Sequence, residues 1–285
     1  MPATPRPEDR TLNVTIDGNT RVTRIWDAAS PTAVILGIHG GMAHAGDYAT
    51  VGGYFRDAGI STVSFDLSGH GYQSRIDVPG FDVLLDDAAQ MLQWTCEQFR
   101  GLPVFVVGHS MGGLIAAHLE LSGRLDAYPV KGVVLSSPYF ANAIPVSPLV
   151  VQLSRVLATL FPRAKVPMES FNEWLTHDPL IVGQILADEK AKLRGTEASF
   201  RFGRALLDAQ AALGHDLSGW HHPLFAAVAG QDRLANAHTS LQMLKTVPAQ
   251  WLELHHYADN FHENFNELNR AQIFGEMLRW MRQLS

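Results

Sequence analysis

The distribution of apolar positions along the chain predicts alternating strands and helices. Two short segments around Asp17-Gly18-Asn19 alternate apolar and polar side chains, as the strands of an antiparallel hairpin do. Later apolar runs show little alternation, which is typical of central strands of a parallel sheet, and the segments between them have helical spacing. The predicted strands are 11–17, 20–26, 32–38, 60–65, 104–107 and 130–136, and the predicted helices include 47–57 and 81–99.

This alternation stops at Pro138 and resumes near residue 220. The segment 139–219 shows no good strand pattern but three stretches of helical spacing, which predicts an inserted helical cap. We expect an α/β fold whose mostly parallel, doubly wound sheet is built from 11–138 and 220–285, after a disordered N-terminus at 1–10. The expected cap helices are 146–161, 178–190 and 197–213, followed by strands 224–229 and 250–255 and helices 237–245 and 265–283.

The candidate nucleophile is Ser110, at the end of the apolar run 104–107. It lies in Gly108-His109-Ser110-Met111-Gly112, and helical spacing follows directly. A strand, a sharp turn and a helix form the context that a Gly-x-Ser-x-Gly nucleophile elbow requires. The turn holds the serine in a strained backbone conformation, and the glycines allow the strand and the helix to approach closely. The sequence therefore predicts that the Ser110 hydroxyl projects above the end of its strand.

A serine nucleophile needs a base and a carboxylate, and candidates for both follow the cap. The base takes up the serine proton, and the carboxylate orients the base. In sheets that carry such an elbow, the order along the chain is Ser, then Asp or Glu, then His. Asp232 follows the first strand after the cap and is the expected carboxylate. His255, His256 and His262 compete as the base, and the position of His262 just before the final helix favours it.

Two backbone N–H groups are expected to bind the oxyanion that forms during acyl transfer. One belongs to the residue after the nucleophile, which is Met111, and the other to a loop after an earlier strand. The segment His39-Gly40-Gly41-Met42 has that position, so we expect Gly41 to supply the second donor. The His39 side chain is expected to brace this loop.

Composition and charge narrow the class of protein. The chain has 285 residues, 46% apolar and 18% charged, which suits one large α/β unit with an insertion. Its net charge of −6 includes no block of like charge, so no nucleic acid is expected as a partner. The single cysteine, Cys96, permits no disulfide framework and favours a cytoplasmic location. We also expect no signal peptide, no membrane-spanning helix, no metal and no other cofactor.

Several short motifs along the chain are consistent with one type of active site. They occur in the order expected for the elbow, its two partners and the loops around them. These motifs are His39-Gly40, Asp66 with Gly69-His70-Gly71, Gly108-His109-Ser110-Met111-Gly112-Gly113, Leu135-Ser136-Ser137-Pro138, Asp232-Arg233, and His262-Glu263 with Phe265-Asn266-Glu267.

Together these motifs resemble the α/β-hydrolase superfamily, in particular its monoacylglycerol lipase and lysophospholipase branch, which is grouped with serine aminopeptidase-like hydrolases. The resemblance runs from residue 12 to 282. It implies Ser110, Asp232 and His262 as the catalytic triad, and Gly41 and Met111 as the oxyanion hole. Two departures concern the polar end of the substrate site. Relatives commonly carry an acidic residue where Ala43 precedes His44, and many carry arginine in place of Ser68.

The resemblance implies a serine hydrolase that cleaves carboxylic esters with an apolar acyl chain through an acyl-enzyme. Its partners are small-molecule esters or lipids, such as monoglycerides or lysophospholipids, and it needs no cofactor. Two alternatives stay open. One is a small-molecule carboxylesterase or an acyltransferase that uses the same acyl-enzyme. The other is a non-catalytic binding protein with this fold, against which the complete set of candidate triad residues argues.

The first cap helix has an unusually wide apolar surface. Residues 146–161 contain one charged side chain, Arg155, and apolar side chains cover more than half of the helix circumference. We expect part of this surface, including Leu153 and Leu157, to line the acyl-binding site. The rest is expected to stay exposed and touch lipid surfaces, as a peripheral membrane contact. The alternative is a helix packed wholly within the cap or in a dimer interface.

Overall fold

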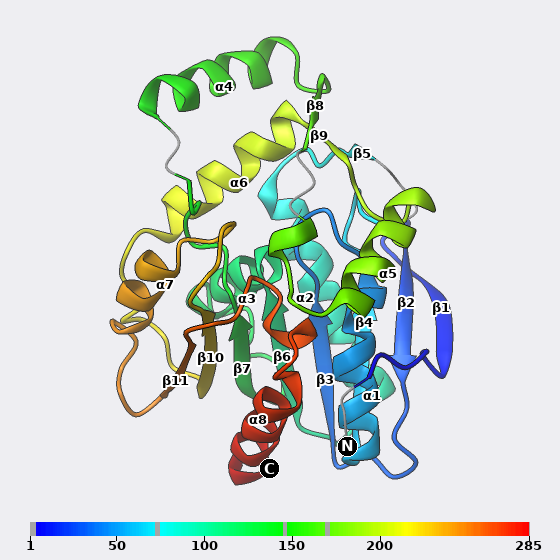
Figure 1. Ribbon diagram of the computed structural model, residues 1–285. Helices are drawn as coiled ribbons and strands as arrows, with labels where there is room; N and C mark the ends of the chain where they lie inside the picture. Colours follow the sequence, from blue (N-terminus) through cyan, green and yellow to red (C-terminus); the bar gives the residue numbers. More distant parts are fainter. Residues whose placement is uncertain (1–3, 72–74, 145–146, 169–171, 285) are drawn as a thin grey trace.

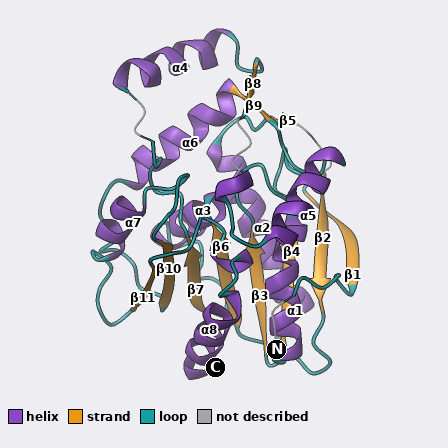
Figure 2. Cartoon of the chain, in the orientation of Figure 1, coloured by secondary structure: helices purple, strands orange, loops and turns teal. Residues whose placement is uncertain are grey.

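The computed structural model describes residues 4–71, 75–144, 147–168 and 172–284. Within them, an eight-stranded sheet runs through the centre of the molecule (Figures 1 and 2). In spatial order its strands are β1 (Arg10–Ile16), β2 (Asn19–Trp26), β4 (Ile60–Phe65), β3 (Ala33–Ile38), β6 (Val104–His109), β7 (Val130–Ser136), β10 (Leu224–Ala229) and β11 (Leu252–Tyr257). β1 and β2 form the predicted antiparallel hairpin, β2 pairs antiparallel with β4, and the other neighbours pair in parallel.

Helices cover both faces of this sheet. The helices are α1 (Ala49–Asp57) and α8 (Arg270–Leu284) on one face, and α2 (Phe81–Gln98), α3 (Met111–Leu121) and α7 (Ala237–Leu244) on the other. In β6, Phe105 and Val107 pack with α1 and α8, whereas Val104 and Val106 pack with α2 and α3. Because successive side chains of a strand point to opposite faces, a strand that is covered on both sides carries mostly apolar residues without alternation. This explains the unbroken apolar runs and confirms the doubly wound α/β fold.

The segment between β7 and β10 contains helices at one end of the sheet (Figure 1). They are α4 (Pro148–Leu160), the short 3-10 helix η2 (Asn172–Trp174), α5 (Pro179–Lys190) and α6 (Phe200–Leu213). One side of α6 continues the main core, because Phe202, Ala205 and Ala209 belong to the same buried cluster as α2 and α3. α4 packs on α6 and lies farthest from the sheet in Figure 1. Val146, the predicted start of the first cap helix, lies outside the described residues.

The expectation of a cap without strands is wrong. A second, three-stranded sheet has the order β5 (Arg75–Ile76), β9 (Glu197–Ser199) and β8 (Lys165–Pro167). These strands have two or three residues, too few to show a period-two pattern, and β5 comes from the core segment before the cap. Ser199 accepts a hydrogen bond from the Phe202 N–H and caps α6, so the predicted helix 197–213 begins three residues later than expected.

Two further segments differ from the prediction. The N-terminal segment, expected to be disordered, bonds to the core: Trp26 Nε1 donates to the Arg6 carbonyl at 2.9 Å and the Asp9 N–H donates to that of Ile25 at 2.8 Å. Residues 1–3 lie outside the described residues.

The predicted final helix 265–283 is divided into the 3-10 helix η3 (Asn264–Asn266) and α8. Among the described helices, none has the length and hydropathy needed to cross a bilayer.

Candidate active site

The chain turns sharply from β6 into α3 at the candidate nucleophile. Ser110 has φ 54° and ψ −117°, a strained conformation for a residue with a side chain. A Cβ on Gly108 would lie 2.3 Å from the carbonyl oxygen of Gly112, and a Cβ on Gly112 would lie 2.0 Å from that of Ile38. Only glycine permits these approaches. The strand, turn and helix therefore have the geometry that the sequence predicts for an elbow.

Asp232 and His262 come together at the ends of β10 and β11. His262 Nδ1 lies 2.7 Å from Asp232 Oδ2, and both side chains are almost fully buried. Asp232 Oδ1 accepts the backbone N–H groups of Leu234 and Ala235, both at 2.9 Å, which fixes the carboxylate. Burial acts to lower the pKa of His262, but the charge and hydrogen bond of Asp232 outweigh it, and the net pKa is raised. Burial acts to raise the pKa of Asp232, and the same pairing lowers it below its ordinary value.

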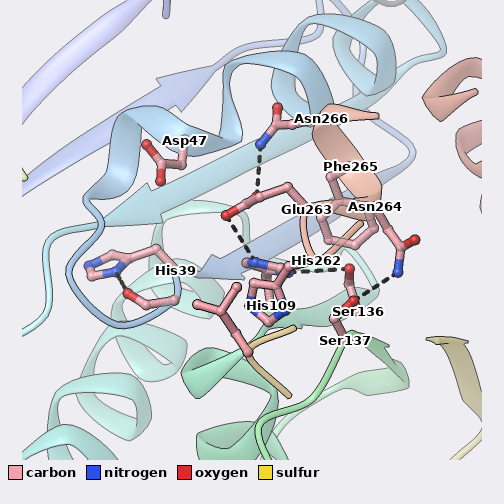
Figure 3. Close-up of polar contacts among 12 residues, drawn as sticks. His39, Asp47, His109, Ser136, Ser137, His262, Glu263, Asn264, Phe265 and Asn266 are labelled. Carbon is pink, nitrogen blue, oxygen red and sulfur yellow. Dashed lines mark hydrogen bonds and ion pairs between the residues drawn. The ribbon is translucent and has the colours of Figure 1, made fainter. Parts of the chain in front are cut away.

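The two competing histidines lie within β11, which ends two residues later than predicted. The His255 ring stacks on Phe225 with centroids 4.6 Å apart, and its Nε2 is 2.9 Å from Glu253. His256 is exposed. The ring of His262 instead lies 4.9 Å from that of His109, the residue that precedes Ser110 (Figure 3). The geometry therefore favours His262 as the partner of the elbow.

The loop after β3 lies against the elbow. A Cβ on Gly40 would meet Ser110 Cβ at 3.2 Å, and one on Gly41 would meet the Met111 sulfur at 3.8 Å. His39 Nδ1 lies 2.7 Å from the Gly40 carbonyl oxygen, and its Nε2 accepts the Leu67 N–H at 3.1 Å, so Nδ1 carries the proton and donates.

This bond sets the direction of the Gly41 N–H. The carbonyl of Gly40 and the N–H of Gly41 belong to one planar trans peptide and point in opposite directions. Because His39 holds the carbonyl, it also fixes the N–H. Burial, followed by the charge of His70, keeps the pKa of His39 well below its ordinary value, so the ring stays neutral and keeps its hydrogen-bond pattern. This is the bracing role that the sequence predicts for His39.

A cavity of about 340 Å³ opens beside Gly41. Much of its wall is apolar, and the segment between β7 and β10 contributes most of it. Sequence reasoning missed these residues, although Met42 and Arg233 directly follow predicted site residues. The lining includes Met42, Tyr139, Asn142, Ile144, Met168, Asn172, Leu175, Glu189, Arg194, Gly195, Thr196, Arg233 and Leu234.

Leu153 and Leu157 are not among the residues that line this cavity. Both lie on α4, where Leu153 is 54% exposed and Leu157 is partly buried. The structure does not bring them to the elbow, so the prediction that they line the acyl-binding site gains no support from the cavity. Leu153 instead lies on the outer surface of the cap, and Leu157 lies on the partly buried side of α4.

Among the residues that the structure describes, two groups of side chains have the proximity needed to bind a metal ion, although sequence spacing shows neither. They are His44 with Asp47 and Asp188, and Glu120 with His221 and His222, each with ligand atoms within 4.8 Å of one another. Within the first group His44 Nε2 lies 3.2 Å from Asp188. Within the second, Glu120 already accepts the backbone N–H groups of both histidines. These contacts explain both groups as hydrogen-bonded and ion-paired clusters.

Comparison with known proteins identifies a family and similar proteins. The family described as serine aminopeptidase, S33, matches residues 29–269. Phospholipase YtpA from Bacillus subtilis is 28% identical over 252 residues, which cover 87% of this chain and 95% of that protein. Monoacylglycerol lipase from Mycolicibacterium smegmatis is 26% identical over 263 residues, which cover 90% of this chain and 91% of that protein.

A solved structure shows the same fold. A soluble variant of monoglyceride lipase from Saccharomyces cerevisiae, crystallised with a substrate analog, is 19% identical and gives a TM-score of 0.83, covering 100% of this chain and 98% of its own. The family match spans Ser110, Asp232 and His262, and the central sheet has the strand arrangement that the resemblance implied. The chain therefore belongs to the serine aminopeptidase, S33, family of the α/β-hydrolases.

Proposed function

We propose that this protein is a serine hydrolase that cleaves carboxylic esters with an apolar acyl chain, as a monoacylglycerol lipase or a lysophospholipase does. Ser110 is the nucleophile, His262 the general base and Asp232 the carboxylate that orients the base. The observation that carries the proposal is the 2.7 Å bond between His262 Nδ1 and Asp232 Oδ2. It leaves His262 Nε2 as the nitrogen that can accept a proton.

The reaction proceeds through an acyl-enzyme. Ser110 Oγ attacks the ester carbonyl while His262 Nε2 takes the hydroxyl proton, and the N–H groups of Gly41 and Met111 bind the oxyanion. His262 then gives the proton to the departing alcohol. A water molecule repeats the sequence on the acyl-enzyme and releases the carboxylic acid. No step needs a metal or another cofactor.

The cavity beside Gly41 supports an apolar acyl group. Met42, Ile144, Leu175 and Leu234 form apolar parts of its wall. Its volume of about 340 Å³ lies at the lower end of the range for small-ligand sites. The names of the relatives, a phospholipase and a monoacylglycerol lipase, also favour lipid esters.

Labelling and substrate profiling test the proposal. A fluorophosphonate probe should label the wild-type protein and leave Ser110→Ala unlabelled. On p-nitrophenyl esters of rising chain length, medium and long acyl chains should give a higher kcat/KM than acetate. Labelling that survives the substitution would refute Ser110 as the nucleophile. A preference for acetate would identify a small-molecule carboxylesterase, and acyl transfer to an added alcohol in preference to water would identify an acyltransferase.

The apolar outer face of α4 supports peripheral contact with lipid surfaces. Leu149, Leu153, Val156 and Leu160 recur at helical spacing and are each more than half exposed. A continuous apolar stripe of this kind marks an interaction surface. The single cysteine and its lack of any disulfide partner support a cytoplasmic location for this contact.

Charge on this stripe should separate lipid delivery from catalysis. Leu153→Asp should weaken co-sedimentation with liposomes and reduce hydrolysis of long-chain esters far more than that of butyrate esters. Leu157→Asp, on the partly buried side of α4, is the comparison variant and should lower Tm instead. Equal loss on all chain lengths in Leu153→Asp would mean damage to the cap, and unchanged long-chain activity would remove α4 from the path of the substrate.

A further inference from the structure

A second buried polar pair lies beside His262 (Figure 3). His109 Nε2 is 3.1 Å from Glu263 Oε1, and the two side chains are 8% and 7% exposed. The other Glu263 oxygen accepts the Asn266 amide at 3.0 Å, and His109 Nδ1 lies 3.3 Å from Ser136 Oγ. His109 Nε2 has no partner in ideal hydrogen-bond geometry, so its contact with the carboxylate is primarily electrostatic.

The contact between His109 and Glu263 connects the segment that carries Ser110 to the segment that carries His262. His109 immediately precedes Ser110, and Glu263 immediately follows His262. The contact therefore joins the neighbour of the nucleophile to the neighbour of the base, across two segments that are far apart in the sequence. The backbone N–H of Glu263 also donates to the Leu175 carbonyl at 2.8 Å, which ties the same loop to the cap.

The pair also places a negative charge near the base. Burial acts to raise the pKa of Glu263, but His109, His262 and Arg194 outweigh it, and the net pKa lies below its ordinary value. The carboxylate therefore stays ionised inside the protein. Its charge adds to that of Asp232 in raising the pKa of His262 against the effect of burial. Within the part of the chain that the structure describes, Glu263 also interacts electrostatically with Arg194 from the cap and with Tyr48 from the 3-10 helix η1 (Ala45–Tyr48).

We propose that Glu263 and His109 form a second positioning unit of the active site, in which Glu263 holds the Ser110 elbow against the His262 loop and places a buried carboxylate next to the base. The inference rests on the proposed roles of Ser110 and His262. It assigns Glu263 no contact with the substrate. Asp232 sets the tautomer of His262. Glu263 contributes a negative charge near His262 and, through His109, a contact with the segment that carries Ser110.

Glu263→Gln removes the charge and keeps the shape of the side chain. The imidazole of His262 must be neutral to accept the serine proton, so kcat/KM falls as the pH drops through the pKa of His262. Loss of a neighbouring negative charge lowers that pKa, and the acidic limb should move to lower pH by about one unit. At the pH optimum, kcat should fall about tenfold through loss of charge stabilisation and positioning, while KM for p-nitrophenyl butyrate changes less than about twofold.

Glu267→Gln is the matched control. Glu267 is a buried carboxylate of the same loop, and its Oε1 accepts the Phe261 N–H at 2.9 Å and lies 2.9 Å from His177 Nδ1. Its substitution should lower Tm without moving the acidic limb. Glu263→Asp keeps the charge but draws it away from His109, so kcat should fall while the limb stays near its wild-type position.

The pH profiles decide the inference. An acidic limb that stays in place in Glu263→Gln, or that moves equally in Glu267→Gln, would overturn it. If Glu263→Gln does not fold, Glu263→Asp and His109→Gln decide in its place, because both keep the charge of Glu263 and should lower kcat without shifting the limb. Wild-type kcat in both would refute the positioning role. Ser110→Ala distinguishes refutation of this inference from refutation of the proposed function. If the proposed function is wrong, Ser110→Ala stays active. If only the positioning role of Glu263 is wrong, Ser110→Ala is inactive.

Discussion

Replacing Asp232 by asparagine should disable His262 without unfolding the protein, because the two oxygens of Asp232 have different partners. Oδ1 accepts the backbone N–H groups of Leu234 and Ala235 at 2.9 Å, and Oδ2 lies 2.7 Å from His262 Nδ1. The single oxygen of an asparagine side chain should take the position of Oδ1, because two backbone N–H groups donate to that position. Its amide must then donate to Nδ1. The imidazole proton moves to Nε2, and no lone pair remains to accept the Ser110 proton.

A wrong tautomer of this kind costs about 10⁴ in kcat, which corresponds to about 5.5 kcal/mol of activation free energy. We expect this loss in hydrolysis of p-nitrophenyl butyrate, with a modest decrease in Tm. The control is Asp216→Asn: Asp216 is exposed and also accepts a backbone N–H, that of Ser218 at 2.8 Å, so the variant should keep wild-type kcat. An Asp232→Asn protein that keeps more than about a tenth of the wild-type kcat would refute the assignment.

Gly112→Ala and His39→Phe test the backbone of the site, and Gly183→Ala is the control for the first. Because a Cβ on Gly112 would lie 2.0 Å from a backbone oxygen, Gly112→Ala should lose about 3 kcal/mol of stability or fail to fold. Gly183→Ala, at an open position of α5, should instead gain about 0.5–1 kcal/mol, as measured by urea unfolding. His39→Phe removes the anchor of the Gly40 carbonyl and should lower kcat by about one to two orders of magnitude with little change in KM. An unchanged kcat in His39→Phe would mean that the loop holds its geometry without this ring.

The central sheet could be predicted from the sequence because its strands carry a strong local signal. β3, β4 and β6 are buried at every position. In β3 and β6 this leaves apolar runs between polar turns, whereas in β4 the apolar residues are interspersed with the small buried polar residues Ser61, Thr62 and Ser64. The hairpin of β1 and β2 shows period-two alternation because one of its faces is more exposed. In each case the burial of a residue depends mainly on the strand that contains it, so the pattern is visible without knowledge of the partners.

The small sheet of the cap left no such signal. β9 has three residues and pairs with β5, which comes from a loop more than a hundred positions earlier. Two strands this short are stable only because the surrounding segments already hold them together. The N-terminal segment is similar, since its composition is that of a flexible tail and its bonds go to β2 and α1. Structure that depends on distant partners cannot be inferred from local periodicity.

The candidate triad was accessible to sequence reasoning for a different reason. Ser110, Asp232 and His262 each follow a strand, and the order of strands in such a sheet fixes which loops meet. The cavity wall does not follow from that order, because most of it comes from the segment between β7 and β10. The contact between Glu263 and His109 could be suspected only from their adjacency to His262 and Ser110. Its geometry required the folded chain.

His44 has acidic partners that are not adjacent to it in the sequence. The family resemblance implied an acidic residue before His44, where this chain has Ala43. His44 nevertheless has acidic partners, because Asp188 of α5 lies 3.2 Å from its Nε2 and Asp47 lies 3.5 Å from it. Burial acts to lower the pKa of His44, but these carboxylates outweigh it and raise the pKa. Arg194, from the chain between α5 and β9, binds Asp47 in turn.

These contacts attach the cap to the loop that carries the candidate oxyanion donor. His44 lies in the same loop as Gly41 and Asp47 lies in η1 directly after it, whereas Asp188 and Arg194 belong to the cap. The Gly195 N–H also donates to the Met42 carbonyl at 2.9 Å, directly beside that donor. The cap segment that lines the cavity and the loop that presents the Gly41 N–H are therefore fixed to each other. Because Asp188 contacts His44 and does not line the cavity, we expect Asp188→Asn to act on that loop through His44 and to lower kcat for p-nitrophenyl butyrate with little change in KM. A variant with wild-type kcat would mean that the loop keeps its geometry without this contact.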